Sequence, residues 1–177
     1  QSTISSIVLI VAMLVSSFAA LRPTGKVLAD HTLPPPSVNL PGSLESEATG
    51  GTCGDWDPTC PTSAFTSAGN EVYVFQSSEI PSGNWEYKVA MGSWSENYGS
   101  NFQQDGPNIL LDLSANRVVR FYYDHKTHYI ADNVRNTIYT VPGSFNSELN
   151  CFGDWQPECL RTFMSDVDGD GVFTFVT

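Results

Sequence analysis

Apolar and polar residues alternate along most of the chain after position 38, a pattern typical of strands with one buried face. In one such segment, Val72 and Val74 alternate with Tyr73 and Phe75. Glycine, proline, asparagine and serine separate the segments, as expected of turns between short strands. We therefore expect a mainly β protein, an antiparallel β-sandwich. The predicted strands lie near residues 38–43, 71–76, 84–91, 108–113, 117–124 and 127–131.

The beginning of the chain has a different pattern. Residues Ile4 to Leu21 are almost continuously apolar, and no charge precedes Arg22. Such a run is just long enough to cross a bilayer as a helix, which needs about 18 to 20 residues. A signal peptide is one interpretation, but the chain starts at Gln1 and has no basic residues ahead of the run. We expect residues 1–22 to form an apolar helix that is retained.

A helix of this kind packs either in lipid or against copies of itself, because exposing its aliphatic side chains to water would drive association. Packing among copies resembles, in architecture alone, the plan of type IV pilins, where an N-terminal apolar helix forms the filament stem. Pilins typically have an aromatic first residue and an acidic fifth one, whereas this chain has Gln1 and Ser5. The residues predicted to mediate self-assembly are Ile7, Leu9, Ile10, Val11, Leu14 and Val15.

Residues 23–37 read as a stalk between this helix and the β region. Arg22-Pro23 interrupts the helical pattern, and the segment ends with Pro34-Pro35-Pro36. Consecutive prolines favour a stiff polyproline II spacer of about 3 Å per residue.

From position 38 onward the chain repeats itself with a period near 100 residues. Pro41-Gly42-Ser43 returns as Pro142-Gly143-Ser144, and Gly54-Asp55-Trp56 returns as Gly153-Asp154-Trp155. Such a period is the size of a sandwich domain. We expect one β-sandwich over residues 38–134 and the start of a second repeat over residues 135–177.

The four cysteines form two close pairs, Cys53 with Cys60 and Cys151 with Cys159. Zinc is the competing interpretation, but structural zinc sites use CxxC-like knuckles or nearby histidines, and the three histidines lie away from both pairs. We therefore predict two local disulfides and an oxidising, extracellular or cell-surface location.

Charge restricts the partners of this chain. Nineteen acidic and eight basic residues give a formal charge of -11, so the surrounding field repels phosphates. The charge argues against nucleic acid as a partner.

Several motifs follow one another in a fixed order: "LPGS", "GDWDP", "IPSGNWEYKVAMGSWSENYGS" and "VRFYYDHKTHYIADN", followed by "VPGSFNSELNCFGDWQPECLRTFMSDVDGDGVFTF". Together they resemble the X25 module of bacterial pullulanases. The resemblance covers residues 38–134 and 140–177. It implies an immunoglobulin-like or starch-binding-like β-sandwich associated with α-glucan-processing proteins. It implies no catalysis, because the hydrolase domain of such enzymes lies elsewhere, and no pair of catalytic carboxylates stands out.

The candidate carbohydrate site is the turn-rich segment "GSWSENYGS". Trp94 and Tyr98 would supply aromatic faces for sugar rings, and Glu96 and Asn97 would bind hydroxyl groups at the rim. Packing in the core is the alternative for Trp94. For Trp56 and Trp155, packing over the adjacent disulfides is favoured.

A calcium loop is the candidate metal site. Asp166, Asp168 and Asp170 alternate in "SDVDGDGVF", as in the first half of an EF-hand ligand set. An acidic turn between strands is the alternative. A third cluster, Asp124, His125 and His128, is interpreted as a solvated turn.

Two functions remain open from the sequence. The preferred hypothesis is a structural subunit of an extracellular pilus-like filament that self-assembles through residues 1–22 and displays X25-like modules. The alternative is a non-catalytic α-glucan-binding module of a secreted or membrane-anchored pullulanase-like protein. A membrane-anchored surface protein, with the apolar segment in lipid, is a further alternative to the filament.

Overall fold

The structure is a computed structural model that describes residues 33–177. The predicted apolar helix and its self-assembly residues Ile7, Leu9, Ile10, Val11, Leu14 and Val15 lie outside the described residues, as does most of the stalk. The described chain is mainly β and antiparallel, as the alternation predicts. Its strands are β1 Thr66–Gly69, β2 Val72–Ile80, β3 Gly83–Tyr87, β4 Val89–Ala90, β5 Asn97–Tyr98, β6 Ile109–Leu113, β7 Arg117–Asp124, β8 Tyr129–Asp132, β9 Met164–Ser165 and β10 Thr174–Phe175. Its helices are α2 Glu45–Ala48 and the 3-10 turns η1 Pro61–Ser63, η2 Ser100–Phe102 and η3 Leu160–Thr162.

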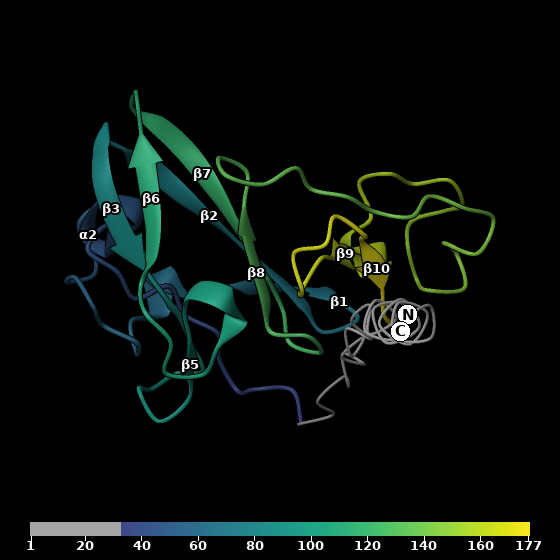
Figure 1. Cartoon of the computed structure of the whole chain (residues 1–177), viewed down its shortest axis with the longest axis horizontal. Coiled ribbons are helices and arrows are strands. Elements are labelled where there is room, and N and C mark those ends of the chain that lie inside the picture. Colours follow the sequence, from purple (N-terminus) through teal and green to yellow (C-terminus); the bar gives the residue numbers. More distant parts are fainter. Residues whose placement is uncertain (1–32) are drawn as a thin grey trace, which may run out of the picture.

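The largest sheet has four strands in the order β1-β2-β7-β8. Alternation along β2 and β7 sends Phe75 and Phe121 to one face, where they stack with ring centroids 6.2 Å apart. The strand pair β3-β6 covers this inner face, and Tyr87 meets Phe121 edge-on at 5.0 Å. Figure 1 shows β3 and β6 as a second layer beside β2 and β7. These two layers around one core are consistent with a β-sandwich.

The predicted strand at 38–43 is instead a segment of isolated bridges. Asn39 pairs with both Ala64 and Ala90, and Gly42 pairs with Tyr87. Pro41 lies between these positions and has no amide hydrogen to donate, which interrupts a regular ladder. The segment still contributes to the core, because Val38 and Leu40 are buried.

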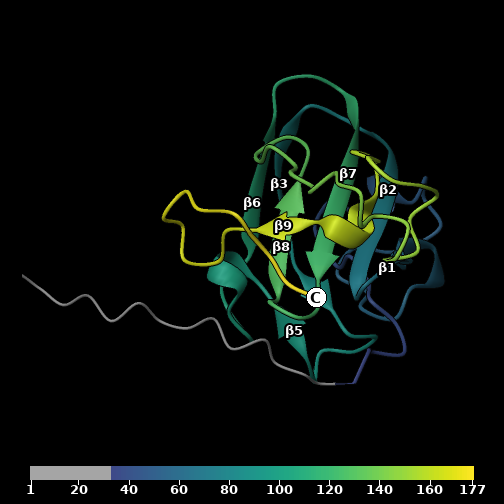
Figure 2. The ribbon, with the colours of Figure 1, turned by 90° about the vertical axis from the view of Figure 1, so that its right-hand side faces the viewer.

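Residues 138–177 form a smaller unit that packs on the outer face of the four-stranded sheet. Figure 1 places β9 and β10 on the side of this sheet away from β3 and β6, and Figure 2, seen from that side, shows β9 in front of the sheet. Phe163 stacks on Tyr122 with centroids 5.9 Å apart. The Asn70 side-chain amide donates to the carbonyls of Arg161 and Val176, at 2.9 and 3.1 Å. Both faces of the sheet are therefore covered, at least in part.

The two sequence repeats have the same local structure. The amide of Trp56 donates to the Gly42 carbonyl at 3.1 Å, and the amide of Trp155 donates to the Gly143 carbonyl at 2.9 Å. Both tryptophans have positive φ angles, 60° and 57°. The two predicted disulfides are confirmed: Cys53 is bonded to Cys60, and Cys151 to Cys159. Their sulfurs are bonded to each other, so no thiolate remains there to bind zinc.

The repeats differ in one buried polar side chain. In the first unit, Glu45 Oε2 accepts a hydrogen bond from the Asp57 amide at 2.8 Å, and Oε1 is enclosed without a partner among the described residues. In the second unit, Asn146 Oδ1 accepts from the corresponding Gln156 amide at 3.3 Å. Both side chains are fully buried. Burial raises the pKa of Glu45 to about 6, with a smaller contribution from the Asp57 charge.

We predict that Glu45→Gln alters the pH dependence of folding. The pKa of Glu45 is higher in the folded state than in the unfolded state. The free energy of unfolding of the wild-type protein therefore falls as pH rises from about 4.5 to about 6. The unfolding free energy of E45Q relative to wild type should therefore increase by about 2 kcal/mol between pH 4.5 and pH 7.5. Urea denaturation across this range measures the difference.

The second unit offers a matched control. Asn146→Asp places a carboxyl in the corresponding buried position and should introduce a similar pH dependence. If the free energy of unfolding depends on pH in the same way in E45Q and in the wild type, Glu45 is not the titrating group.

Candidate functional site

Two tryptophans from distant segments lie together at the surface. The rings of Trp56 and Trp94 are 6.4 Å apart between centroids, with an angle of 34° between their planes. Trp94 is 42% exposed and Trp56 is half-buried. Trp56 lies in the loop closed by the first disulfide, and Trp94 in the loop between β4 and β5. The arrangement is a partly exposed aromatic pair, which we call the tryptophan pair.

The disulfide loop holds Trp56 in place. Its positive φ and its hydrogen bond to Gly42 fix the backbone, and the Ser46 amide donates to Asp55 Oδ1 at 3.0 Å to tie the loop to α2. The sequence favours packing of Trp56 over its disulfide, which stays a prediction; the structure shows the ring beside Trp94. The sequence singled out Trp56 through the repeated Gly-Asp-Trp motif and Trp94 through its turn-rich segment, but no local signal predicted that the two rings lie together.

The four residues predicted to bind sugar are not equally accessible. Asn97 is buried and bonded on both sides, because its amide nitrogen donates to Asp105 Oδ1 at 2.7 Å and its oxygen accepts from Lys88 at 2.9 Å. Tyr98 is also buried, and it stacks on His128 with centroids 4.0 Å apart. Neither residue presents a free face to solvent, which corrects the prediction of an exposed Tyr98.

Glu96 and Trp94 are the accessible members of the predicted set. Glu96 is half-exposed, and its Oε1 accepts from the Tyr98 hydroxyl at 3.1 Å. This hydrogen bond orients the carboxylate of Glu96, which lies in the same loop as Trp94. Their part in sugar binding stays a prediction.

The turn between β7 and β8 is buried, contrary to the prediction of a solvated turn. Asp124 and His125 are each 1% exposed. Lys126 forms an ion pair with Asp124 at 2.9 Å and donates to the Asn70 carbonyl. The Tyr123 hydroxyl lies within hydrogen-bond distance of both His125 Nδ1, at 3.1 Å, and His128 Nδ1. These hydrogen bonds and the ion pair explain how polar residues can be buried here, and they tie the turn to the connection between β1 and β2.

The three predicted calcium ligands come together in the second unit. One carboxylate oxygen from each of Asp166, Asp168 and Asp170 lies within 4.8 Å of the others. Asp166 Oδ2 accepts from the Gly171 amide at 3.1 Å, while Oδ1 is enclosed without a hydrogen-bond partner among the described residues. The loop can therefore offer oxygen ligands of the kind that calcium prefers.

Within residues 33–177, no helix has the length and apolar character needed to cross a bilayer.

Taken together, these features define a disulfide-containing, mainly β module built from two related units. A family model described as the pullulanase X25 domain matches residues 37–130 and 138–177, and the chain belongs to this family. X25 is a non-catalytic accessory domain of pullulanases. The two matched segments correspond to the two repeats.

The relatives are much longer proteins. An amylopullulanase of Thermoanaerobacterium saccharolyticum is 36% identical over 100 residues, which is 56% of this chain and 8% of that protein. An amylopullulanase of Thermoanaerobacter thermohydrosulfuricus is 41% identical over 78 residues, 43% of this chain and 5% of that protein. A pullulanase from Bacillus acidopullulyticus has a similar solved structure, with 24% identity, a TM-score of 0.49, and coverage of 57% of this chain and 12% of that one. The chain thus spans only a small part of each.

Proposed function

We propose that this chain is a non-catalytic carbohydrate-binding module, of immunoglobulin-like or starch-binding-like β-sandwich type, that binds α-glucan through the tryptophan pair. The observation that carries the proposal is the exposed pair itself. Aromatic rings stack on the C–H face of a sugar ring, and neighbouring polar groups bind the hydroxyls. Glu96, in the same loop as Trp94, is a polar group of this kind.

The geometry of the pair favours an α-linked chain. Successive glucosyl rings of an α-1,4-glucan turn relative to each other along a curved path, and two ring planes inclined by 34° match such a path. A flat β-1,4-glucan would match coplanar rings better. Charge is also compatible, since a neutral polysaccharide is not repelled by a protein of formal charge -11.

Family membership supports this proposal better than it supports the filament hypothesis. Pullulanases and amylopullulanases are the proteins in which the domain and the relatives occur. The residues on which self-assembly was predicted lie outside the described part of the chain. Two disulfides fit the extracellular or cell-surface location that we propose with this function.

We predict that Trp94→Ala and Trp56→Ala each weaken binding to pullulan or amylose by about tenfold, because each removes one stacking surface, worth about 1.4 kcal/mol. Affinity electrophoresis in gels containing the polysaccharide measures the dissociation constant. Salt should change it little, since no charge pairing with a neutral glucan is involved.

Trp155→Ala is the matched control. Trp155 occupies the equivalent position of the second unit, with a similar positive φ angle and more exposure. Its removal should leave glucan binding unchanged. Equal losses in W94A and W155A, or no loss in W94A, would count against the tryptophan pair as the binding surface.

A second proposal concerns calcium at Asp166, Asp168 and Asp170. The enclosed and unpaired Asp166 Oδ1 favours it, because a carboxylate oxygen without a hydrogen-bond donor is costly unless a cation binds it. The ion would hold the loop before β10 closed and so stabilise the second unit.

We predict that millimolar calcium raises the thermal unfolding midpoint by a few degrees, since a ligand that binds only the folded state stabilises it by mass action. Differential scanning fluorimetry with calcium, magnesium or chelator measures the shift. Asp168→Asn should remove the response, whereas Asp112→Asn, an exposed residue on β6, should retain it. The same midpoint with calcium and with chelator would exclude the site.

A further inference from the structure

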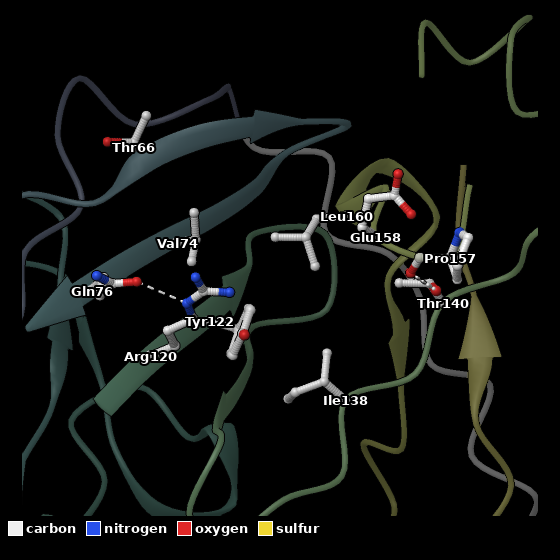
Figure 3. A pocket seen from close by; sticks show the side chains of 10 residues that line it. All are labelled: Thr66, Val74, Gln76, Arg120, Tyr122, Ile138, Thr140, Pro157, Glu158 and Leu160. Carbon is white, nitrogen blue, oxygen red and sulfur yellow. Dashed lines mark hydrogen bonds between the residues drawn. The ribbon is translucent and has the colours of Figure 1, made fainter. Parts of the chain in front are cut away.

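A cavity of about 530 Å³ lies where the second unit meets the outer face of the sheet. Its lining comes from both units (Figure 3). Gln76 and Arg120 extend from β2 and β7, and Glu158 and Leu160 come from the segment that follows the second Gly-Asp-Trp motif. The volume is within the range of small-molecule sites, which is roughly 300 to 1,000 Å³. Neither the tryptophan pair nor the acidic loop contributes to it.

The sheet side of the cavity is formed by two facing residue pairs of the β2–β7 ladder. We call the first the apolar rung and the second the polar rung. Val74 is paired with Tyr122, and the next outward-facing pair along the strands is Gln76 with Arg120. Arg120 Nε donates to Gln76 Oε1 at 2.9 Å, which orients the guanidinium group. Phe163 stacks on Tyr122, so the apolar rung is where the second unit docks and the polar rung is where the cavity opens.

The opposite side is formed by the second unit. The Thr140 hydroxyl donates to the Pro157 carbonyl at 2.6 Å, which holds together the two segments that line this side. Figure 3 shows Gln76 and Arg120 on one side and Glu158 and Thr140 on the other, with Tyr122, Ile138 and Leu160 between them. The cavity therefore has an apolar floor and polar walls.

The walls carry one positive and one negative charge, Arg120 and Glu158, so the lining has no net charge that would favour an ion. Arg120 and Glu158 are both exposed and form no ion pair with each other in the described structure. An anionic ligand would face Glu158 and the net negative charge of the protein, and a cationic ligand would face Arg120. A hydroxyl group can accept from a guanidinium and donate to a carboxylate, so a polyhydroxylated molecule satisfies both walls. The apolar floor suits the C–H face of a sugar ring.

We propose that this cavity is a saccharide-binding site, formed jointly by the two units, that takes a short neutral oligosaccharide. It shares a ligand class with the proposed function but none of its residues. The site exists only while the second unit is docked on the sheet, so ligand binding there stabilises the docked arrangement. The tryptophan pair would bind a long glucan chain at the surface, whereas this half-open cavity would hold one or two sugar units.

Titration of the full chain with maltotriose, followed by saturation-transfer NMR and calorimetry, tests the proposal. We expect Arg120→Met and Glu158→Gln each to raise the dissociation constant at least tenfold. Arg117→Met is the matched control, because Arg117 is exposed on the same strand and lies outside the cavity lining; it should leave the constant unchanged. Circular dichroism checks that each variant is folded, and the exposed Glu158 gives a second variant if Arg120→Met is unstable.

The outcomes separate the two sites. Maltotriose binding that persists in Trp94→Ala and is lost in Arg120→Met and Glu158→Gln supports the cavity, whatever the result with polysaccharide. Maltotriose binding that W94A abolishes and the cavity variants retain overturns the cavity proposal and leaves the tryptophan pair standing. Absence of maltotriose binding to the wild type, or tighter binding of glucuronate than of glucose, also overturns it.

Discussion

The packing of the second unit on the outer face of the four-stranded sheet is the interaction on which the rest of the structure depends. Val72, Tyr122 and Tyr129 are apolar side chains on a face that would otherwise meet water, and Phe163 covers them. Burying one such side chain contributes about 1.5 to 3 kcal/mol, so this contact decides whether the units behave as one body. It also creates the cavity between the two units that is lined by Gln76, Arg120 and Glu158, here called the junction cavity, because docking at Tyr122 leaves the neighbouring polar residue pair open.

The two repeats show which part of the module is locally determined. The Pro-Gly-Ser segment, the disulfide loop and the tryptophan with positive φ are the same in both units, because backbone hydrogen bonds and a local disulfide hold them. Burial is different. Val38 and Val72 are almost fully buried in the first unit, whereas Tyr139 and Val172, at the matching positions, are 44% and 64% exposed. Local structure therefore repeats, but the surrounding core does not.

This difference bears on function. In the first unit, the loop between β4 and β5 brings Trp94 beside Trp56, and the aromatic pair results. The described part of the second unit places no such loop against Trp155. The Gly-Asp-Trp motif thus contributes to the tryptophan pair in the first unit and gives a single exposed ring in the second. Trp155 therefore serves as the control for Trp56.

The features that the sequence allowed us to predict are those with a local signal. Alternation predicted the strands over 71–76, 108–113 and 117–124, and cysteine spacing predicted both disulfides. Contacts between distant segments had no such signal, so the approach of Trp56 to Trp94 and the burial of Tyr98 were missed. The turn at Asp124 looked solvated because it is polar, and only the structure shows its ion pair and hydrogen bonds. The junction cavity depends on docking of the second unit, which alternation along one strand does not specify.

Differential scanning calorimetry of the chain tests the docking most directly. If the second unit is packed on the sheet through Phe163 and Tyr122, both units should unfold in one cooperative transition, with equal calorimetric and van't Hoff enthalpies. Two transitions at separate temperatures would contradict a common folded body.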